Sequence, residues 1–186
     1  MRVFQLFIAL LCTLFISNVF SADHKLRLGT DVIYETHFEY EFSIIPFLGG
    51  YVNYGSGDRK IDKYNTSTNG YKVGTRFYIP LIGYLGVGYQ HINFDYSYIA
   101  SQASGSISQN DTVTIGGALS GLVFEAGKEW GVGPVILGAN ANYLLVSPSS
   151  LSAKANNVSV DSDDVTEGIV DQTSLWNVAA YIGIQF

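Results

Sequence analysis

The chain has 186 residues, a length typical of one domain, and its 16 acidic residues against 10 basic ones give a net charge of −6. An acidic chain lacks the basic surface that nucleic acid requires, which argues against a nucleic-acid-binding protein and against electrostatic adhesion to an anionic membrane face. Apolar residues make up 47% of the sequence, yet no run of eighteen apolar residues follows the N-terminal segment, as a membrane-spanning helix would require.

The N-terminal segment has the layout of a secretory signal peptide. Arg2 supplies a positive charge, the apolar run Leu6–Ile16 follows, and small and polar residues come next. We therefore predict a signal peptide over residues 1–22, cleaved after Ser21 or one residue later, and a mature domain over residues 23–186. A retained signal anchor is the alternative.

The first part of the mature domain alternates between apolar and polar residues from Leu26 to Ile44 without a change of phase. One unbroken strand here would give seven strands in total, whereas bacterial single-chain barrels have even strand numbers. We therefore expect two short strands joined by a tight turn near Gly29–Asp31. Another turn around Ser43–Pro46 would precede a strand over Phe47–Tyr54.

Further along the chain, segments with one apolar face and one polar or small face predict strands. They cover Tyr71–Ile79, Gly83–Tyr98, Thr112–Ala126 and Val135–Leu145. The apolar face changes sides at Leu122, which predicts a bulge near Gly121, and the phase changes in a similar way around Gln90.

The connections between these strands alternate in length. Short links lie at Pro80–Ile82 and around Trp130–Gly131, and long polar segments lie at Gly55–Asn69, Ser101–Asp111 and Ser147–Ser174. Membrane barrels show the same alternation, with short periplasmic turns and long external loops. A C-terminus in the periplasm would place all three long segments at the cell surface.

The final segment alternates most strictly and ends on a phenylalanine. Its apolar positions are Trp176, Val178, Ala180, Ile182, Ile184 and Phe186. This pattern resembles the closing strand of bacterial outer-membrane barrels, which in that family is also the signal for the barrel-assembly machinery. On that resemblance, the assembly signal would consist of Trp176, Val178, Ile182, Ile184 and Phe186.

A second resemblance concerns the start of the domain. Glu39-Tyr40-Glu41-Phe42, followed by Phe47-Leu48-Gly49-Gly50-Tyr51, is similar to the strand–turn–strand opening of opacity-type and OmpA-like transmembrane barrels. The resemblance implies an all-β, antiparallel, up-and-down transmembrane β-barrel in the bacterial outer membrane. We expect eight strands, with six or ten as alternatives, and outer-membrane lipid and lipopolysaccharide as partners.

Several polar side chains lie opposite the apolar faces of their strands and would point into the barrel lumen. They are Lys72, Arg76, Glu125, Asn140, Asn142, Asn177, Tyr181 and Gln185. The interior of an eight-stranded barrel is just wide enough to be filled by side chains, and buried charges need partners. We therefore expect a salt-bridge and hydrogen-bond network that plugs the lumen; a gated pore or a small polar ligand site is the alternative.

Two groups of residues rich in carboxylates raise the question of a metal site. The first, on the polar phase of the N-terminal segment, predicts an inward- or water-facing strand edge, with a divalent-cation site as the alternative. The second predicts a solvated loop, and we expect no metal or cofactor at either. The groups are Asp31, Glu35, His37, Glu39 and Glu41, and Asp161, Asp163, Asp164, Glu167 and Asp171.

The sequence offers little for catalysis. Cys12 lies within the signal segment, so the mature chain has no thiol nucleophile, and no histidine has a serine two residues away on the same strand face. Asn93 holds that position after His91, and we expect His91 to pack among aromatic residues. A Ser and a carboxylate within hydrogen-bond reach of His91 near the outer rim would instead indicate an enzyme.

Aromatic residues near strand ends predict the interfacial girdles of a membrane barrel: Tyr84, Tyr89, Phe94, Tyr96, Tyr98, Trp130 and Trp176. The predicted function is therefore that of a porin-like outer-membrane scaffold, not an enzyme, with a plugged lumen and polar loops that interact at the cell surface. The alternatives are a small channel or carrier for a solute, a lipid A-modifying enzyme, and a soluble secreted β-sandwich.

Overall fold

A computed structural model describes residues 24–61, 64–100, 110–156, 158–160 and 173–186. The predicted signal peptide, the segment 101–109 and the second acidic group lie outside these residues. None of the described residues forms a helix long and apolar enough to span a bilayer. The strands are β1 His24–Asp31, β2 Thr36–Ile45, β3 Leu48–Ile61, β4 Tyr64–Ile79, β5 Gly83–Ile99, β6 Thr112–Val132, β7 Val135–Ala155, β8 Val158–Val160 and β9 Thr173–Gln185.

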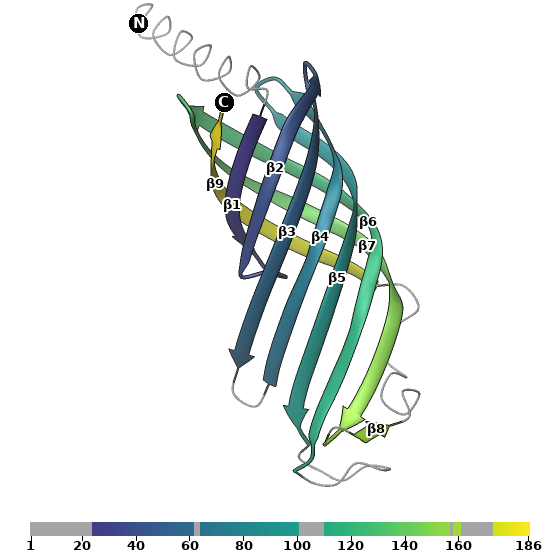
Figure 1. Ribbon diagram of the computed structural model, residues 1–186. Helices are drawn as coiled ribbons and strands as arrows, with labels where there is room; N and C mark the ends of the chain where they lie inside the picture. The colour runs from purple at the N-terminus through teal and green to yellow at the C-terminus, as the bar shows by residue number, and fades with distance from the viewer. Residues whose placement is uncertain (1–23, 62–63, 101–109, 157, 161–172) are drawn as a thin grey trace, which may run out of the picture.

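Eight of these strands form a closed antiparallel ring (Figure 1). Each of β1 to β7 pairs with the next strand along the chain, and β9 closes the ring by pairing with both β1 and β7. β8 is a short addition that pairs with the end of β7. Closure leaves the membrane-spanning strands without free edges, as lipid requires, because each unsatisfied backbone group there costs several kcal/mol. The predicted eight-stranded barrel is confirmed.

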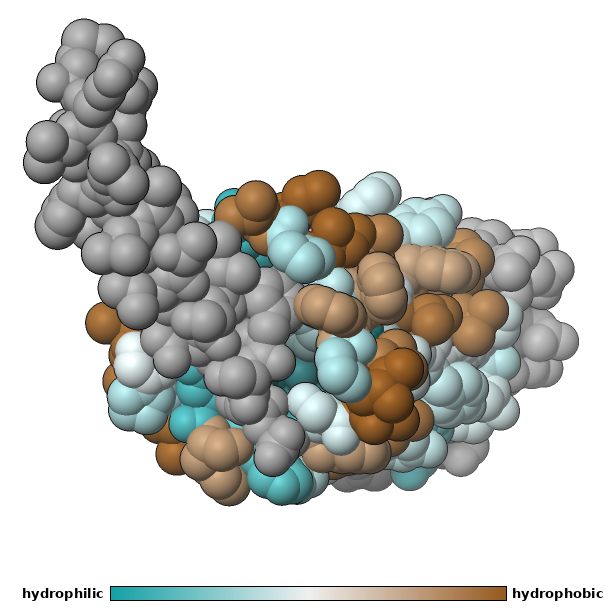
Figure 2. All heavy atoms as spheres, turned by 90° about the horizontal axis from the view of Figure 1, so that it is seen from above, coloured by the Kyte–Doolittle hydropathy of each residue, from teal (hydrophilic) through white to brown (hydrophobic). Residues whose placement is uncertain are grey.

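The outer wall of the ring carries a band of apolar side chains. Large apolar residues face outward at every second position, as Val87 does at 47% exposure, and Figure 2 shows such side chains in brown on the wall. Exposed aromatic residues mark both borders of this band, among them Trp130 near the short turns and Tyr89 toward the other end. Alternation of this kind is the signature of a wall that faces lipid.

The barrel has two different ends. The short turns at Pro46–Phe47, residues 80–82 and residues 133–134 lie with the C-terminus at one end, which we call the turn end. At the opposite, extended end, β3 to β7 continue beyond the apolar band (Figure 1). The extension is a sheet rather than a set of loops.

In the extension the polarity of the two faces is reversed. On β5 the outward residues are Asn93, Asp95 and Ser97, whereas Phe94 and Tyr96 face inward beside the apolar cluster of β6. The predicted bulge near Gly121 is wrong, because β5 and β6 pair without interruption through Gln90↔Gly121. The apolar face changes sides there because the strands leave the lipid, not because the backbone slips.

The actual irregularity lies between β6 and β7. Leu119 pairs with Pro148 and Ala118 pairs with Ser150, so Ser149 has no partner in the register. The bulge therefore belongs to β7 and lies beyond the apolar band.

Two of the predicted loops are largely strand. β3 and β4 pair as far as Ile61↔Tyr64, so most of Gly55–Asn69 is a hairpin, and β7 continues through Ser147 to Ala155. These segments are rich in polar residues because their outward face meets water. The turn predicted at Pro80–Ile82 is confirmed, the one predicted near Gly29–Asp31 falls at residues 32–35, and the one predicted around Trp130–Gly131 falls at residues 133–134.

Interior tyrosines occupy space that glycines leave open. A Cβ atom at Gly138 would lie 2.3 Å from the ring of Tyr181, and one at Gly55 would lie 2.3 Å from the ring of Tyr34. Four of the predicted girdle aromatics also turn out to face inward, in the lumen or on the concave face of the extension: Tyr84, Phe94, Tyr96 and Tyr98. The glycines in these strands thus make room for aromatic rings inside the barrel.

The border between lipid and water along β5 can be tested with one added charge. We expect Val87→Lys to lower the free energy of unfolding by about 2–4 kcal/mol, because a lysine on the lipid-facing wall near the bilayer midplane is that unfavourable. Ser97 lies on the same face of the same strand, in the polar extension. Ser97→Lys should change the free energy of unfolding by less than about 0.5 kcal/mol. Urea unfolding from lipid vesicles measures both values, and equal losses would contradict the proposed border.

Candidate functional site

The lumen holds four cations and four carboxylates that we call the lumen network. These eight residues come in four pairs, one pair to a strand. The members of a pair lie two or four positions apart, so both project to the same face of the strand. β1, β2, β4 and β6 contribute one pair each, and every member is at most 9% exposed. The members are Lys25 and Arg27, Glu39 and Glu41, Lys72 and Arg76, and Glu125 and Glu129.

Arg76 is bound by carboxylates from two strands. Its Nε lies 2.5 Å from Oε1 of Glu125, and its Nη1 contacts Glu39 and lies 2.9 Å from Oε2 of Glu41. Lys72 binds the other oxygen of Glu125, with 2.7 Å between Nζ and Oε2. Glu125 therefore bridges two cations of the same strand.

Arg27 forms the matching centre toward the turn end. Its Nη1 donates to Oε1 of Glu39 at 2.7 Å, and its Nη2 lies 2.5 Å from Oε1 of Glu129. Lys25 donates to Oε2 of Glu129 at 2.9 Å. Glu39 contacts both arginines, so the two centres form one neutral network, which is the condition under which buried charges are tolerated.

Tyrosines complete the coordination of this network. The hydroxyl of Tyr78 donates to Glu41 at 2.6 Å and accepts from Arg27 at 3.0 Å, and that of Tyr181 donates to Glu129 at 3.0 Å. The guanidinium of Arg76 lies over the rings of Tyr51 and Tyr84, 4.2 and 4.8 Å from their centroids. These contacts fill the remaining volume and add cation–π attraction.

Amide side chains form a layer on the extended side of the charges. Asn142 donates to Asn140 at 3.1 Å, Asn140 donates to Tyr84 at 3.2 Å, and Asn177 accepts from the backbone N–H of Val32 at 2.9 Å. A cavity of about 10 Å³ remains among these side chains. That volume corresponds to roughly one water molecule and cannot pass a solute.

Tyr34 closes the lumen above the amides. It lies in the turn between β1 and β2, is 2% exposed, and packs against the buried side chains of Ile92, Val123 and Leu144. Asp31 holds the turn, since its Oδ1 accepts hydrogen bonds from the backbone N–H groups of Ile33 and Tyr34. The interior thus ends in an apolar layer at the height where the outer wall becomes polar.

All eight residues predicted from the sequence to point into the lumen are buried. The structure brings Lys72, Arg76 and Glu125 into direct contact, whereas Gln185 lies apart and donates to the carbonyl of Gly133 at the turn end. The prediction missed Lys25, Arg27 and Glu129. The sequence pattern could have identified them. Lys25 and Arg27 alternate with Leu26 and Leu28, and Glu129 lies on the same face of its strand as Glu125.

Two members of the first group, Glu39 and Glu41, serve as partners to cations of the chain itself. Glu39 and Glu41 bind arginines, Asp31 lies 3.3 Å from His37, and Glu35 is exposed. The described residues contain no cluster of three or more His, Cys, Asp or Glu that could hold a metal ion. The carboxylates that the alternative assigned to a divalent cation, Glu39 and Glu41, bind arginine side chains instead.

A closed eight-stranded ring with an apolar outer band and a salt-bridged lumen defines the fold of a small outer-membrane β-barrel. Two similar solved structures are those of Acinetobacter baumannii CarO, with a TM-score of 0.52 and 12% identity, and CarO2, with 0.51 and 10%. The alignments cover 89% and 88% of this chain and 98% of each of those chains. No family model and no curated protein sequence matches the chain. The resemblance to opacity-type and OmpA-like barrels stays a prediction.

The lumen network can be tested by a double-mutant cycle between Arg76 and Glu125. We expect Arg76→Met to lower the free energy of unfolding by about 3–5 kcal/mol, because it leaves buried carboxylates without their partner. The double variant with Glu125→Gln should lose less than the sum of the two single losses. Urea unfolding measures the cycle. The exposed Lys128→Met serves as control, and an Arg76→Met loss as small as the control would contradict the network's role.

Proposed function

We propose that the protein resides in the bacterial outer membrane as a closed scaffold that presents a polar sheet and its connecting segments at the cell surface. The observation that carries this proposal is the neutral lumen network beneath the apolar layer around Tyr34. A solute channel needs a continuous polar path, and a carrier for apolar solutes needs an apolar lumen. Eight paired charges and a 10 Å³ cavity provide neither.

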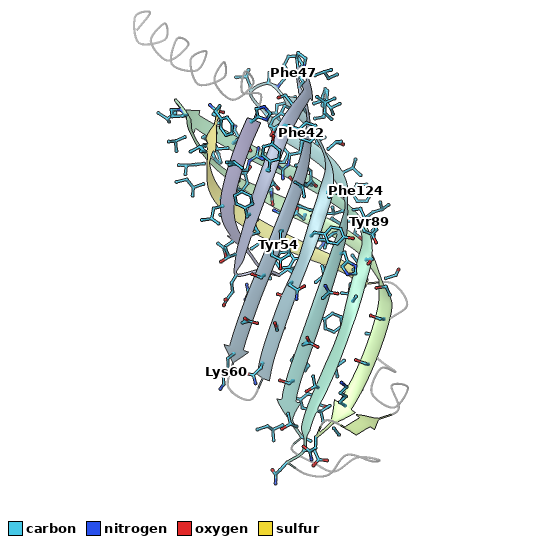
Figure 3. The ribbon with its side chains drawn as sticks, viewed as in Figure 1. Phe42, Phe47, Tyr54, Lys60, Tyr89 and Phe124 are labelled. Carbon is cyan, nitrogen blue, oxygen red and sulfur yellow. The ribbon has the colours of Figure 1, made fainter. Side chains whose placement is uncertain are left out.

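The extension supports a role in surface contacts. Its outward face begins where the apolar band ends, at the height where the sugars and phosphates of lipopolysaccharide would lie. Hydroxyl, amide and charged side chains there suit hydrogen bonding to such groups. On β3 and β4 they are Ser56, Asp58, Lys60, Asn65, Ser67 and Asn69, and Figure 3 labels Lys60 near the tip of β3.

The C-terminal strand supports recognition by the barrel-assembly machinery. The five residues of the predicted signal all face outward, from Trp176 at 71% exposure to Phe186 at 62%. Phe186 also exchanges two backbone hydrogen bonds of 3.0 Å with His24 at the start of β1. The assembly signal would thus lie on β9, the strand that closes the ring by pairing with β1.

Location and assembly are tested together in cells that express the full chain. We expect recovery in the outer membrane and a faster-migrating band in unboiled samples, because a closed barrel resists detergent until it is heated. Deleting Phe186 should abolish both, while Phe47→Ser, at an exposed aromatic of the same end, should preserve them. Recovery as a soluble protein with no mobility shift would contradict the proposal.

The closed lumen is tested by conductance in planar bilayers. We expect no ion-conducting steps from the folded wild type, because the lumen network and the Tyr34 layer fill the ring. Tyr34→Ser/Arg76→Ser/Glu125→Ser opens the Tyr34 layer, removes one cation and one carboxylate, keeps the charge balanced, and should introduce steps that show the assay responds to an opened lumen. Steady conductance from the wild type would overturn the closed scaffold in favour of a channel.

A further inference from the structure

A hydrogen-bonded chain of side chains crosses the outer wall of the barrel. His91 of β5 and Ser120 of β6 lie opposite one another, with 2.7 Å between Nδ1 and Oγ. On its other side, Nε2 of His91 lies 3.2 Å from Oδ1 of Asn93. Asn93 in turn donates through Nδ2 to Oδ1 of Asn69 on β4, at 3.1 Å. A serine, a histidine and two amides thus stand in sequence across three strands.

The direction of these hydrogen bonds follows from their far end. Because Nδ2 of Asn93 donates to Asn69, its Oδ1 is turned toward His91, and a carbonyl oxygen can only accept. This arrangement favours the tautomer of neutral His91 in which Nε2 donates to Asn93 and Nδ1 accepts from the hydroxyl of Ser120. In that tautomer histidine can remove a proton from serine, and the group that orients the ring is the amide of Asn93 in place of the carboxylate expected from the sequence.

The chain lies at the border between the apolar band and the polar extension. Two residues from His91 and from Ser120 toward the turn end are Tyr89 and Leu122, exposed at 42% and 50% on the same wall. Figure 3 labels Tyr89 at this height. In the other direction the outward residues are polar. A group held here faces sideways into the membrane interface and not into the lumen.

The surroundings fix the strand that carries His91 and offer a further hydrogen-bond donor. Ser147 lies opposite Ser120 on β7 and is exposed on the same face, directly beside the bulge at Ser149. Its hydroxyl is suited to donate to an oxyanion that forms next to Ser120. On the other side of the sheet, Ile92 is buried in the apolar cluster around Tyr34, which fixes the strand that carries His91.

We propose that this wall site hydrolyses fatty acyl esters of membrane lipids, with Ser120 as the nucleophile and His91 as the base. Oγ of Ser120 bonds to the ester carbonyl carbon while its proton passes to Nδ1 of His91. The carbon–oxygen bond to the alcohol then breaks, and His91 gives the proton to the leaving oxygen. Water then bonds to the acyl carbon while its proton passes to His91. The carbon–oxygen bond to Ser120 breaks as His91 returns that proton to Oγ, so the products are a fatty acid and the deacylated lipid.

The position of the site selects this substrate class. An ester carbonyl of a membrane lipid lies at the interface, with its acyl chain toward the apolar band and its head group toward water. Tyr89 and Leu122 would contact the chain, and the polar outward face of the extension would contact the head group. Asn93 is a positioning residue, because it acts on the substrate only through the ring of His91.

The experiment uses the full mature chain, refolded in detergent and mixed with vesicles of a diacyl phospholipid or with vesicles that contain lipid A. Fatty acid release is measured by mass spectrometry, and labelling of Ser120 by an alkyl fluorophosphonate is located on the peptide. We expect release from one lipid and labelling at Ser120. Release from the phospholipid or from lipid A identifies which of the two carries the ester.

Variants separate catalysis from structure. Ser120→Ala and His91→Gln should reduce release roughly 100-fold or more, while Lys128→Met, on the outward face of β6 near the turn end, should not. Asn93→Leu should lower kcat and leave KM unchanged. The isosteric Asn93→Asp should keep the kcat of the wild type, because a carboxylate also accepts from Nε2 of His91. All variants should keep the heat-modifiable band of a folded barrel. Absence of release from both lipids, or release that survives Ser120→Ala, would overturn the proposal.

Discussion

The interior of this barrel depends on the mutual neutralisation of eight buried charges. An isolated ionised group in such an interior costs many kcal/mol, so each cation must meet a carboxylate at hydrogen-bond distance. The contacts run across the ring, as between Lys25 of β1 and Glu129 of β6, and not only between neighbouring strands. A slip of one residue in any of these strands would turn its charges toward lipid. The lumen network therefore fixes the register of the strands that the backbone ladder alone leaves free to slide.

The alternation of the sequence predicted the strands well wherever their environment was constant. Within the apolar band each position faces either lipid or lumen, so Trp176–Phe186 and Val135–Leu145 could be identified from their residues alone. The prediction failed where the strands left the band, because the same alternation then has its polar residues outside. The segments Gly55–Asn69 and Ser147–Ser174 were interpreted as loops for this reason, although β3, β4 and β7 continue through much of them.

The same change of environment hid the wall site. A bulge near Gly121 would have placed Ser120 on the lumen face, whereas the continuous pairing of β5 and β6 places it outward beside His91. The position two residues after His91 on its own strand holds Asn93 and no serine. Ser120 is a cross-strand neighbour, and cross-strand neighbours depend on a register that the sequence does not state. The pairs Arg27–Glu129 and Arg76–Glu39 could not be predicted from the sequence for a related reason, because they join strands that are not neighbours in the ring.

A filled lumen leaves the wall and the rim as the places where this fold can do chemistry. The height at which polarity reverses is special, because an outward polar side chain there touches lipid while the strand behind it is held by buried apolar residues such as Ile92. Toward the turn end a serine on the wall would lie in hydrocarbon without water for hydrolysis, and farther along the extension it would lie away from lipid. A site that needs both an ester and water must therefore lie at a border of the apolar band, and His91 and Ser120 lie at the border on the extended side. The plug and the wall site share one physical basis, since the packed interior that excludes solutes also holds the wall rigid enough to keep two strands in hydrogen-bond register.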